Sequence, residues 1–575
     1  MSYRAPTRDL AFTLMHVAEV GRLPDAPDLD VIEAVLAGAA DLSENVLAPL
    51  NRLGDKEGAR YENGRVTLPA GFPEAYRAYA EGGWGGLSAS EEWGGQALPT
   101  ALAQAALETV HAANMAFGLC PLLTLAAVEA LEAHGTPAQQ AVYLPKLVSG
   151  EWTGTMNLTE PQAGTDLAAV RARAEPNGDG TYALHGSKIY ITWGDHDVAD
   201  NIVHLVLARL PDAPEGVRGI SLFLAPKILL DEDGSLGSPN ALRPGGIEHK
   251  LGINASPTCT MLFEGARAEL VGEPNQGLAH MFTMMNAARL GVGVEGVGIA
   301  ERANQAALAY ARERRQGRSS WSGEPGAPIF DHPDVRRTLS IMKARIEAAR
   351  AICLLTAVEA DLGESDPRAR RRYELLVPVA KAWSTDMAVE VASMGVQVHG
   401  GMGFIEETGA AQHYRDARIA PIYEGTNGVQ ALDLVGRKLA AGDGEALREL
   451  ADDMRDTAAA LAASEALSDL APPLSAGIAA VQQGGAWLLE RRGSPDALAG
   501  ATPFLKLVGD VAGGWLLAKG ALAAAGSTDP YLAAKAPLAR VYTHQILSAA
   551  PASLAAVTAG ADELYGLTAE LLGAA

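Results

Sequence analysis

A change in the pattern of residues along the chain limits its fold more than any other feature of the sequence. From about residue 151 to 273, short runs rich in Val, Ile, Thr and aromatic residues alternate with turn sequences such as Asn-Gly-Asp-Gly (177–180) and Asp-Gly (233–234). Such runs predict an antiparallel β domain. The segments on either side carry apolar residues at spacings of three and four, which predict helices. We therefore expect an α+β fold that is mainly helical, with the β domain in the middle.

The helical segments and their breaks suggest how the chain is divided. The best predicted helices cover residues 30–47, 100–134, 277–315, 334–362 and 368–394, and Ala-rich helical sequence follows residue 438. The Pro/Gly/Ser-rich stretch 317–328 predicts a mobile loop. We expect an N-terminal extension, an N-terminal helical domain, the β domain, a C-terminal helical bundle and an appended helical domain, at residues 1–40, 41–154, 155–275, 276–440 and 441–575.

Length, charge and cysteine content narrow the class of protein. A chain of 575 residues is long enough for several domains. Its formal charge of −23 argues against a nucleic-acid or anionic-membrane partner, because both are polyanions. The three cysteines are distant from one another and no motif has metal-ligand spacing, so we expect neither a disulfide framework nor a metal site. The N-terminus lacks the pattern of a signal peptide, and we expect a cytoplasmic protein.

One loop carboxylate is the candidate catalytic base. Glu424 stands in Ile-Tyr-Glu-Gly-Thr-Asn-Gly (422–428), between an apolar approach and two glycines. A carboxylate abstracts a weakly acidic proton only when it is poorly solvated and well aimed, and a sharp turn between apolar neighbours provides both conditions. A single loop glutamate is far more often a solvated surface residue, so other motifs must decide.

Two further glycine motifs could in principle bind a phosphate. Gly-Val-Gly-Val-Glu-Gly (291–296) matches the dinucleotide fingerprint in letters, but it lies inside a predicted helix, where glycines instead allow close packing of two helices. Gly-Gly-Met-Gly (400–403) follows a predicted helix and is the better candidate for phosphate contact. The segment 156–166, together with 190–193, offers hydrogen-bonding groups and aromatic walls suited to a planar heterocycle.

Seven motifs in order resemble those of the acyl-CoA dehydrogenases. They include Leu-Thr-Glu-Pro-Gln-Ala-Gly-Thr-Asp (158–166), Gln-Val-His-Gly-Gly-Met-Gly-Phe (397–404) and Ile-Tyr-Glu-Gly-Thr (422–426), and the others lie at 83–95, 188–192, 250–258 and 310–316. The resemblance covers about residues 40–440, and the tail is similar to a subgroup with a C-terminal extension. It implies an N-terminal helical domain, a middle β domain and a four-helix bundle that enclose FAD.

The resemblance also implies a reaction and roles for single residues. An acyl-CoA is oxidised to trans-2-enoyl-CoA in a step of the β-oxidation type; Glu424 takes the α-proton and the β-hydride goes to flavin N5. Electrons then pass to an electron-transfer flavoprotein. Residues matching positions around the flavin ring and ribityl chain are Met156, Leu158, Thr159, Gly164, Thr165, Tyr190, Thr192 and Thr426. Residues matching positions that bind the FAD pyrophosphate and adenine across a subunit boundary are Arg314, Gln316, Gln397, Gly400 and Gly401. Substrate contacts are implied for Thr165, Asn286, Arg289 and Tyr423, and a homo-oligomer of at least two copies follows.

Some positions depart from the family's usual residues. Tyr190 replaces a Trp beside the flavin and Thr165 replaces a Ser, which keeps the chemistry. Trp193 stands where Asn is common, and we expect it to alter the pocket beside the flavin. Gly317 replaces a Phe that packs near the adenine in the family. Another residue must therefore pack on the adenine, and Trp321 is the candidate.

Three alternatives stay open at the level of sequence. An acyl-CoA oxidase on the same scaffold would pass electrons to oxygen, and no motif reports oxygen access. A noncatalytic protein that binds CoA or flavin is disfavoured by Glu424, because a scaffold has no need of the base. The appended helical domain could dock a partner enzyme, but helical faces buried against a neighbour are the commoner use of such sequence.

Overall fold

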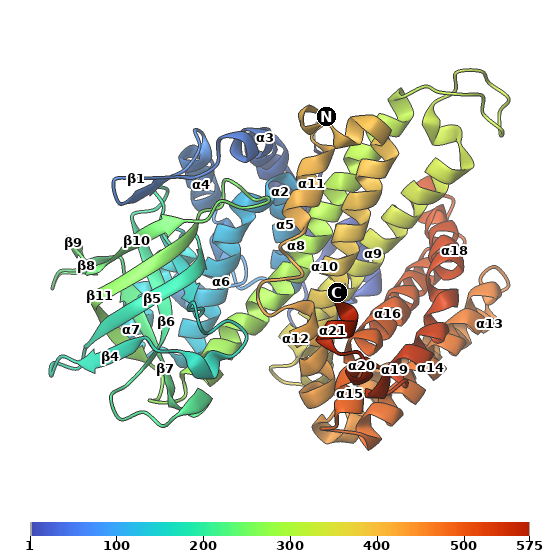
Figure 1. The fold of residues 1–575 in the computed structure, drawn as a ribbon. Helices are drawn as coiled ribbons and strands as arrows, with labels where there is room; N and C mark the ends of the chain where they lie inside the picture. The colour runs from blue at the N-terminus through green and yellow to red at the C-terminus, as the bar shows by residue number, and fades with distance from the viewer. Residues whose placement is uncertain (1–2, 574–575) are drawn as a thin grey trace.

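The computed structural model describes residues 3–573, and the segment before residue 150 is mainly helical as predicted (Figure 1). Asn114 divides the predicted helix 100–134 in two: its backbone is extended, and its side chain accepts a hydrogen bond from the Phe117 N–H at 3.2 Å, so it caps the second helix. Thr136 and Gln139 form a capping box at the start of the next helix. The helices are α1 (Thr7–Phe12), α2 (Leu29–Asp41), α3 (Ala48–Glu57), α4 (Phe72–Glu81), α5 (Thr100–Ala113), α6 (Met115–His134) and α7 (Pro137–Val148).

Helix α6 is the one helix of the described chain that is long and apolar enough to cross a membrane. Of its most apolar stretch, 83% is buried within the protein, against α8 and strand β3 (Trp152–Asn157). Length and composition alone do not distinguish a membrane-spanning helix from the core helix of a globular domain. The burial of α6 is that of a core helix.

The middle of the chain forms a seven-stranded sheet. Its order is β10-β11-β5-β4-β6-β3, and β7 pairs with both β11 and β6. The pairing is antiparallel except where β3 runs parallel to β6 and where Arg173 of β4 pairs with Arg209 of β6. Beyond β3 the strands are β4 (Arg173–Pro176), β5 (Tyr182–Thr192), β6 (Asn201–Arg209), β7 (Ile220–Pro226), β10 (Leu242–Ile247) and β11 (Thr258–Val271). Two small hairpins pair β1 (Arg60–Glu62) with β2 (Arg65–Thr67) and β8 (Ile228–Leu230) with β9 (Leu236–Pro239).

Three long helices form the centre of the molecule: α8 (Gly277–Glu313), α9 (Pro333–Leu362) and α10 (Pro367–His399). The short helices α11 (Ala410–Ala417) and α12 (Asn427–Asp433) pack on α10. A Cβ at Gly293 would stand 2.7 Å from the Ala380 carbonyl oxygen of α10, and one at Gly296 would stand 3.0 Å from that of Ser384. The glycines of 291–296 therefore serve helix packing, as predicted, and the match to the dinucleotide fingerprint lies in the interior of α8, not between a strand and the start of a helix.

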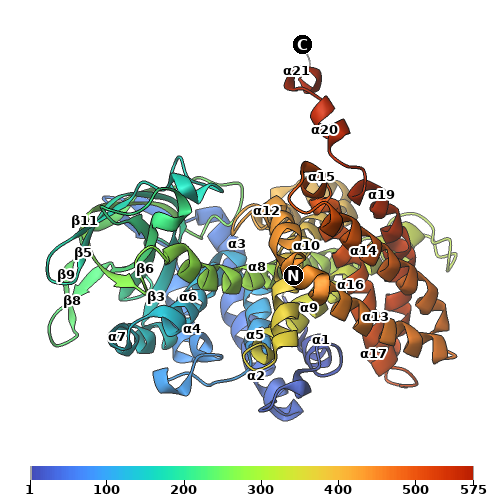
Figure 2. The same cartoon turned by 90° about the horizontal axis from the view of Figure 1, so that it is seen from below.

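The appended domain is helical throughout and packs on the far side of α9 and α10 from the sheet (Figures 1 and 2). Its longest helix, α16, is buried along most of its length. The segment 562–572 extends away from the body (Figure 2). The helices are α13 (Glu445–Ala463), α14 (Ala471–Glu490), α15 (Pro495–Ala499), α16 (Ala501–Ala523), α17 (Pro530–Ala533), α18 (Lys535–Gln545), α19 (Leu554–Val557), α20 (Asp562–Gly566) and α21 (Ala569–Leu572).

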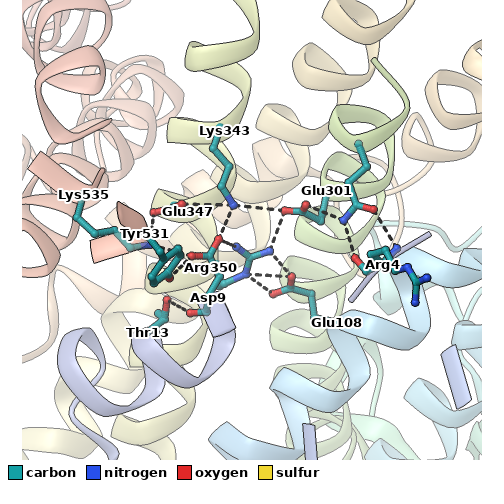
Figure 3. A network of polar contacts seen from close by, with 11 residues as sticks. Arg4, Asp9, Thr13, Glu108, Glu301, Lys343, Glu347, Arg350, Tyr531 and Lys535 are labelled. Atoms are coloured by element: carbon teal, nitrogen blue, oxygen red, sulfur yellow. Dashed lines mark hydrogen bonds and ion pairs between the residues drawn. The ribbon is translucent and has the colours of Figure 1, made fainter. Parts of the chain in front are cut away.

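A buried network of charges joins the start of the chain to its end (Figure 3). The fully buried Arg350 guanidinium contacts Asp9 at 3.4 Å, Glu108 at 2.6 Å and Glu301 at 3.1 Å. Asp9 also accepts hydrogen bonds from Lys535, at 2.8 Å, and from the Tyr531 hydroxyl and Lys343. Burial by itself would raise the pKa of Asp9, but these cations hold it well below its ordinary value. Helix α1 is therefore bound to the central bundle and to the appended domain at once.

Candidate active site

Glu424 lies on the loop between α11 and α12, in a backbone conformation that few side chains adopt. Its φ is +55° and that of Gly425 is +83°, so two successive residues occupy the left-handed region. The loop is closed by a hydrogen bond from the Asn427 N–H to the Pro421 carbonyl at 3.0 Å. Thr426 then caps α12, because its Oγ1 accepts from the Val429 N–H at 3.2 Å. A residue held in this strained region is a mark of functional sites.

The Glu424 carboxylate is poorly solvated and has free hydrogen-bonding capacity. No described residue donates a hydrogen bond to it, and its own backbone N–H has no partner within residues 3–573. Burial raises the pKa of Glu424 to about 7, against the opposing charges of Lys381 and Arg289. A carboxylate in this state is a stronger base than one in water and half-ionised near neutral pH.

Arg289 on α8 supports the loop from one side. Its guanidinium donates to Asp433 Oδ2 at 3.1 Å and to Asn286 Oδ1 at 3.3 Å, and its Nε reaches the Glu424 carbonyl at 3.5 Å. The resemblance implied substrate contacts for Arg289 and Asn286, and the structure places both beside the loop that carries Glu424, one helical turn apart on α8. Arg289 is almost fully buried, which lowers its pKa, while Asp433 and Glu424 favour its charged form.

Lys381 on α10 supports the loop from the other side. Its ammonium donates to the Gly425 carbonyl and to Asn427 Oδ1, both at 2.9 Å. Gln430 adds hydrogen bonds to the carbonyls of Glu424 at 3.2 Å and Gly425 at 3.3 Å. Sequence reasoning missed Lys381, although a single lysine inside the apolar run 375–383 was a usable signal of burial with a partner.

Tyr423, the residue before Glu424 in the sequence, forms a buried pair with Glu295. The Tyr423 hydroxyl lies within hydrogen-bond distance of both carboxyl oxygens of Glu295, at 2.5 Å from Oε2. Burial raises the pKa of Glu295 to about 8, so this carboxyl is mostly protonated at neutral pH. A substrate contact was predicted for Tyr423, whereas Glu295 was overlooked inside the glycine motif 291–296, where it is the lone charge in an apolar run.

The residues predicted to surround the flavin ring lie together at one end of the sheet and the adjoining loop. Met156 ends β3 with Leu158 and Thr159 after it, Gly164 and Thr165 lie on the following loop, and Tyr190 and Thr192 end β5. The Tyr190 side chain is 61% exposed at φ +60°, and nothing lies within 4 Å of where a Cβ of Gly164 would stand. This surface leaves room for a large ligand.

Trp193 does not belong to that surface, contrary to our expectation. It is 1% exposed, its Nε1 donates to the Ala116 carbonyl at 3.2 Å, and its ring packs edge-on against Phe117. Its φ of +52° turns the chain after β5 so that the indole points into the core. Trp193 therefore joins the β domain to α6.

The residues predicted to bind the pyrophosphate and adenine lie elsewhere. Arg314 and Gln316 follow the end of α8, and Gln397, Gly400 and Gly401 lie where α10 ends, all of them exposed. A helix of 37 residues is about 55 Å long. Arg314 and Gln316 follow its C-terminal end, whereas the β domain packs at its N-terminal end, where Gly277 lies against Ser221 and Leu222 of β7 (Figure 1). Within one chain the two groups of cofactor residues are therefore far apart. Gly400 and Gly401 again have open space at their Cβ positions, and Phe404 and Trp321 are 87% and 88% exposed.

A cavity of about 630 Å³ lies beside the loop that carries Glu424, between α10, α12 and α16. Trp383, Asp386 and Asn427 are among its lining residues, and Glu424 is not. The cavity touches the loop at Arg418, Pro421 and Asn427, and the Asn427 side chain donates to Asp386 Oδ1 at 2.8 Å.

Four family models match the chain in succession. They are the acyl-CoA dehydrogenase N-terminal domain over residues 33–151, its middle domain over 155–266, its C-terminal domain over 275–439, and the acetyl-CoA dehydrogenase C-terminal like domain over 450–568. The first three matches contain the motifs described above, and the fourth covers most of the appended domain.

Individual relatives extend the likeness to the full length. A 3-methylmercaptopropionyl-CoA dehydrogenase of Ruegeria pomeroyi is 48% identical over 99% of this chain and 100% of its own. The solved butyryl-CoA dehydrogenase of Megasphaera elsdenii shares 30% identity with a TM-score of 0.61, covering 72% of this chain and all of that one. An acyl-CoA dehydrogenase of Bacillus anthracis, solved with FAD, has the same fold over 99% of this chain and 93% of its own, with a TM-score of 0.74 at 21% identity.

Proposed function

Since the chain belongs to the acyl-CoA dehydrogenase family, we propose that it oxidises an acyl-CoA thioester to the trans-2-enoyl-CoA, with Glu424 as the catalytic base. Membership of this family, in the subgroup with a C-terminal helical domain, makes the protein an FAD-dependent oxidoreductase, as the motifs predicted. The observation that carries the proposal is the state of Glu424: it is poorly solvated and held at positive φ, and no residue in the described range 3–573 donates a hydrogen bond to its carboxylate.

Removal of an α-proton from a thioester requires a base and a place for the negative charge that develops on the thioester oxygen. Glu424 takes the proton. Its own backbone N–H, which has no partner among the described residues, donates a hydrogen bond to the thioester oxygen. Arg289 and Lys381 add positive charge beside the loop, and both disfavour protonation of Glu424 before the substrate binds.

The residues at the end of the sheet fit a flavin. Free space beside Gly164 lets a ligand approach the backbone, and the exposed ring of Tyr190 offers an apolar surface for the flavin ring. Thr165 and Thr192 supply hydroxyl groups for hydrogen bonds. Met156, Leu158 and Thr159 border this surface, and Thr426 approaches it from the catalytic loop. Bound FAD supplies the acceptor for the hydride that leaves the β-carbon. Asn286 and Tyr423 are assigned to substrate contact.

We further infer a homo-oligomer of at least two copies. The length of α8 separates Arg314 and Gln316 from the flavin-ring residues of the same chain, so Arg314, Gln316, Gln397, Gly400 and Gly401 serve the FAD of a second copy. The exposed Phe404 and Trp321 lie on the same segments and would be covered by that copy. Trp321 is thus available to pack on the adenine in place of the aromatic side chain that Gly317 lacks.

Substrate and electron acceptor follow from the relatives. The name of the Ruegeria pomeroyi relative makes 3-methylmercaptopropionyl-CoA the first thioester to test, with short unbranched acyl-CoAs beside it. An electron-transfer flavoprotein is the proposed acceptor, since the relatives are named dehydrogenases; oxygen as acceptor would make the protein an oxidase. A cytoplasmic location stays a prediction.

The test is an anaerobic titration of the purified yellow protein with a panel of acyl-CoAs, followed by admission of air. Loss of the visible flavin band is expected with at least one thioester, and slow peroxide formation on aeration would favour a dehydrogenase. Glu424→Gln should keep bound flavin and show no bleaching. No bleaching of the unaltered protein with any thioester would refute the proposed reaction, and full activity of Glu424→Gln would place the base elsewhere.

A further inference from the structure

The loop that carries Glu424 is anchored from behind by a second polar cluster. Its centre is Lys381, whose ammonium is fully buried on α10 and makes two hydrogen bonds, to the Gly425 carbonyl and to Asn427 Oδ1. Asn427 is oriented in turn, because its Nδ2 donates to Asp386 Oδ1 at 2.8 Å and to the Ala382 carbonyl at 3.0 Å. The side-chain oxygen of Asn427 is thereby directed at Lys381.

A buried ammonium is costly unless it is paired and hydrogen-bonded. Lys381 has no ion pair within 4.0 Å among residues 3–573, in contrast to the buried Lys188, which contacts Glu160 at 2.7 Å. The carboxyl groups around Lys381 are Glu424, Glu295 and Asp386, and the charge of Arg289 opposes them. Glu295 is bound to Tyr423 and mostly protonated at neutral pH, and Asp386 is hydrogen-bonded to Asn427. Glu424 has the largest charge interaction with Lys381 of the three.

We propose that Lys381 is a positioning residue for the reaction: it fixes the Gly425 carbonyl so that Glu424 stays in its left-handed conformation, and it holds a positive charge behind the base. This proposal rests on the assignment of Glu424 as the base. The first role aligns the carboxylate and frees the Glu424 N–H to face the substrate. The second keeps the carboxylate ionised in a site that would otherwise favour its neutral form.

The direction of the pH effect follows from the second role. A base must be deprotonated, so kcat/KM rises with pH through the pKa of Glu424. An opposite charge nearby lowers a carboxyl pKa by about one to three units. Removal of the Lys381 charge therefore raises the pKa of Glu424 and moves the acid limb of the profile to higher pH.

Lys381→Met keeps the length and apolar stem of the side chain and removes the charge and the donors. We expect it to retain flavin, to lower kcat at least about tenfold with a smaller change in KM, and to move the acid limb of kcat/KM upward by at least about one pH unit. The matched control is Lys535→Met, which removes another buried ammonium, far from the loop, that contacts Asp9 and Glu347. The control should lower the melting temperature and leave the acid limb unchanged.

A titration independent of turnover separates failure of this proposal from failure of the proposed function. The carboxyl stretch of Glu424 is assigned by infrared difference spectroscopy as the band that Glu424→Gln abolishes, and it is followed against pH in the unaltered protein and in Lys381→Met. An upward shift of its midpoint in Lys381→Met supports the proposal even if no thioester bleaches the flavin. A midpoint and an acid limb that stay at their original pH overturn it. If Lys381→Met does not fold, Asn427→Leu, which removes the acceptor that orients Lys381, is measured in the same way, and an unmoved midpoint there overturns it equally.

Discussion

The indole Nε1 of Trp383 on α10 donates a hydrogen bond to Oδ1 of Asp510 on α16, at 2.9 Å. Both side chains are buried, and this contact ties the central bundle to the appended domain. The neighbouring Gly509 lies so close to the Trp383 ring that a Cβ could not be added without displacing one of them. The two helices therefore meet by direct packing, and the appended domain is a structural part of the bundle.

Gly509→Leu should disrupt this joint. The added side chain would collide with Trp383, and overpacking of a core costs about 1–3 kcal/mol. Thermal unfolding should show a lower melting temperature, and limited proteolysis should release fragments cut near residue 441. Gly436→Ala is the control, because nothing lies within 4 Å of the added methyl group. Equal stability of the two variants would mean that α10 and α16 are not packed as described.

The pH dependence of kcat/KM should report the state of Glu424. Burial raises its pKa to about 7, so the base is mostly protonated below that value and ionised above it. The expected profile rises through about pH 7, with a rate at pH 5 that is about a hundredfold below the plateau. Initial rates at limiting thioester across this range provide the measurement. A plateau that extends down to pH 5 would mean that a different group, or an unshifted Glu424, limits the reaction.

Asp9→Asn should destabilise the protein strongly although it lies outside the active site. The change removes the carboxylate shared by Lys343, Arg350 and Lys535 and leaves buried cations with too little negative charge. Breaking a buried ion pair by loss of one partner costs about 3–5 kcal/mol. Urea unfolding of Asp9→Asn should show this loss, with the exposed Asp30→Asn as a control that changes stability little. Because the pKa of Asp9 is lowered, its contribution is present above about pH 4 and is lost as the pH falls through its folded pKa.

Mixing two inactive variants should restore activity if the cofactor site is shared between copies. Glu424→Gln lacks the base, and Arg314→Ala lacks a proposed contact to the partner's cofactor. In a mixed dimer, one site carries both defects and the other carries neither. Co-expressed and separately tagged chains, purified through both tags, should therefore show about half the activity of the unaltered dimer. Mixed dimers as inactive as the parent variants would mean that each chain binds FAD with its own residues only.

The fold could largely be predicted from the sequence, because its signals are local. Runs rich in Val, Ile and Thr between turn sequences located the β domain, and apolar spacing located α9 and α10 to within a few residues at each end. The division at Asn114 was not predicted, since an asparagine is tolerated inside a helix and only its capping hydrogen bond to the Phe117 N–H reveals the break. The parallel pairing of β3 with β6 also depends on topology and leaves no local pattern.

The site was predicted in part. Motifs identified Glu424 and Arg289, but the supporting groups come from distant helices: Lys381 is 44 residues from Gly425, and Glu295 is 128 residues from Tyr423. The side chain of Trp193 was assigned to the wrong side, because a strand pattern assumes regular alternation and the positive φ at Tyr190 and Trp193 interrupts it. Such residues become visible only when backbone conformation is known.

The buried network around Asp9 has a consequence for how the chain is made. Lys535, one of the partners of Asp9, lies 526 residues after it in the sequence. The contact between them can form only once α18 has been synthesised, whereas Lys343 and Arg350 on α9 are available to Asp9 much earlier. The appended domain therefore supplies the last of the buried cations that balance the charge of Asp9.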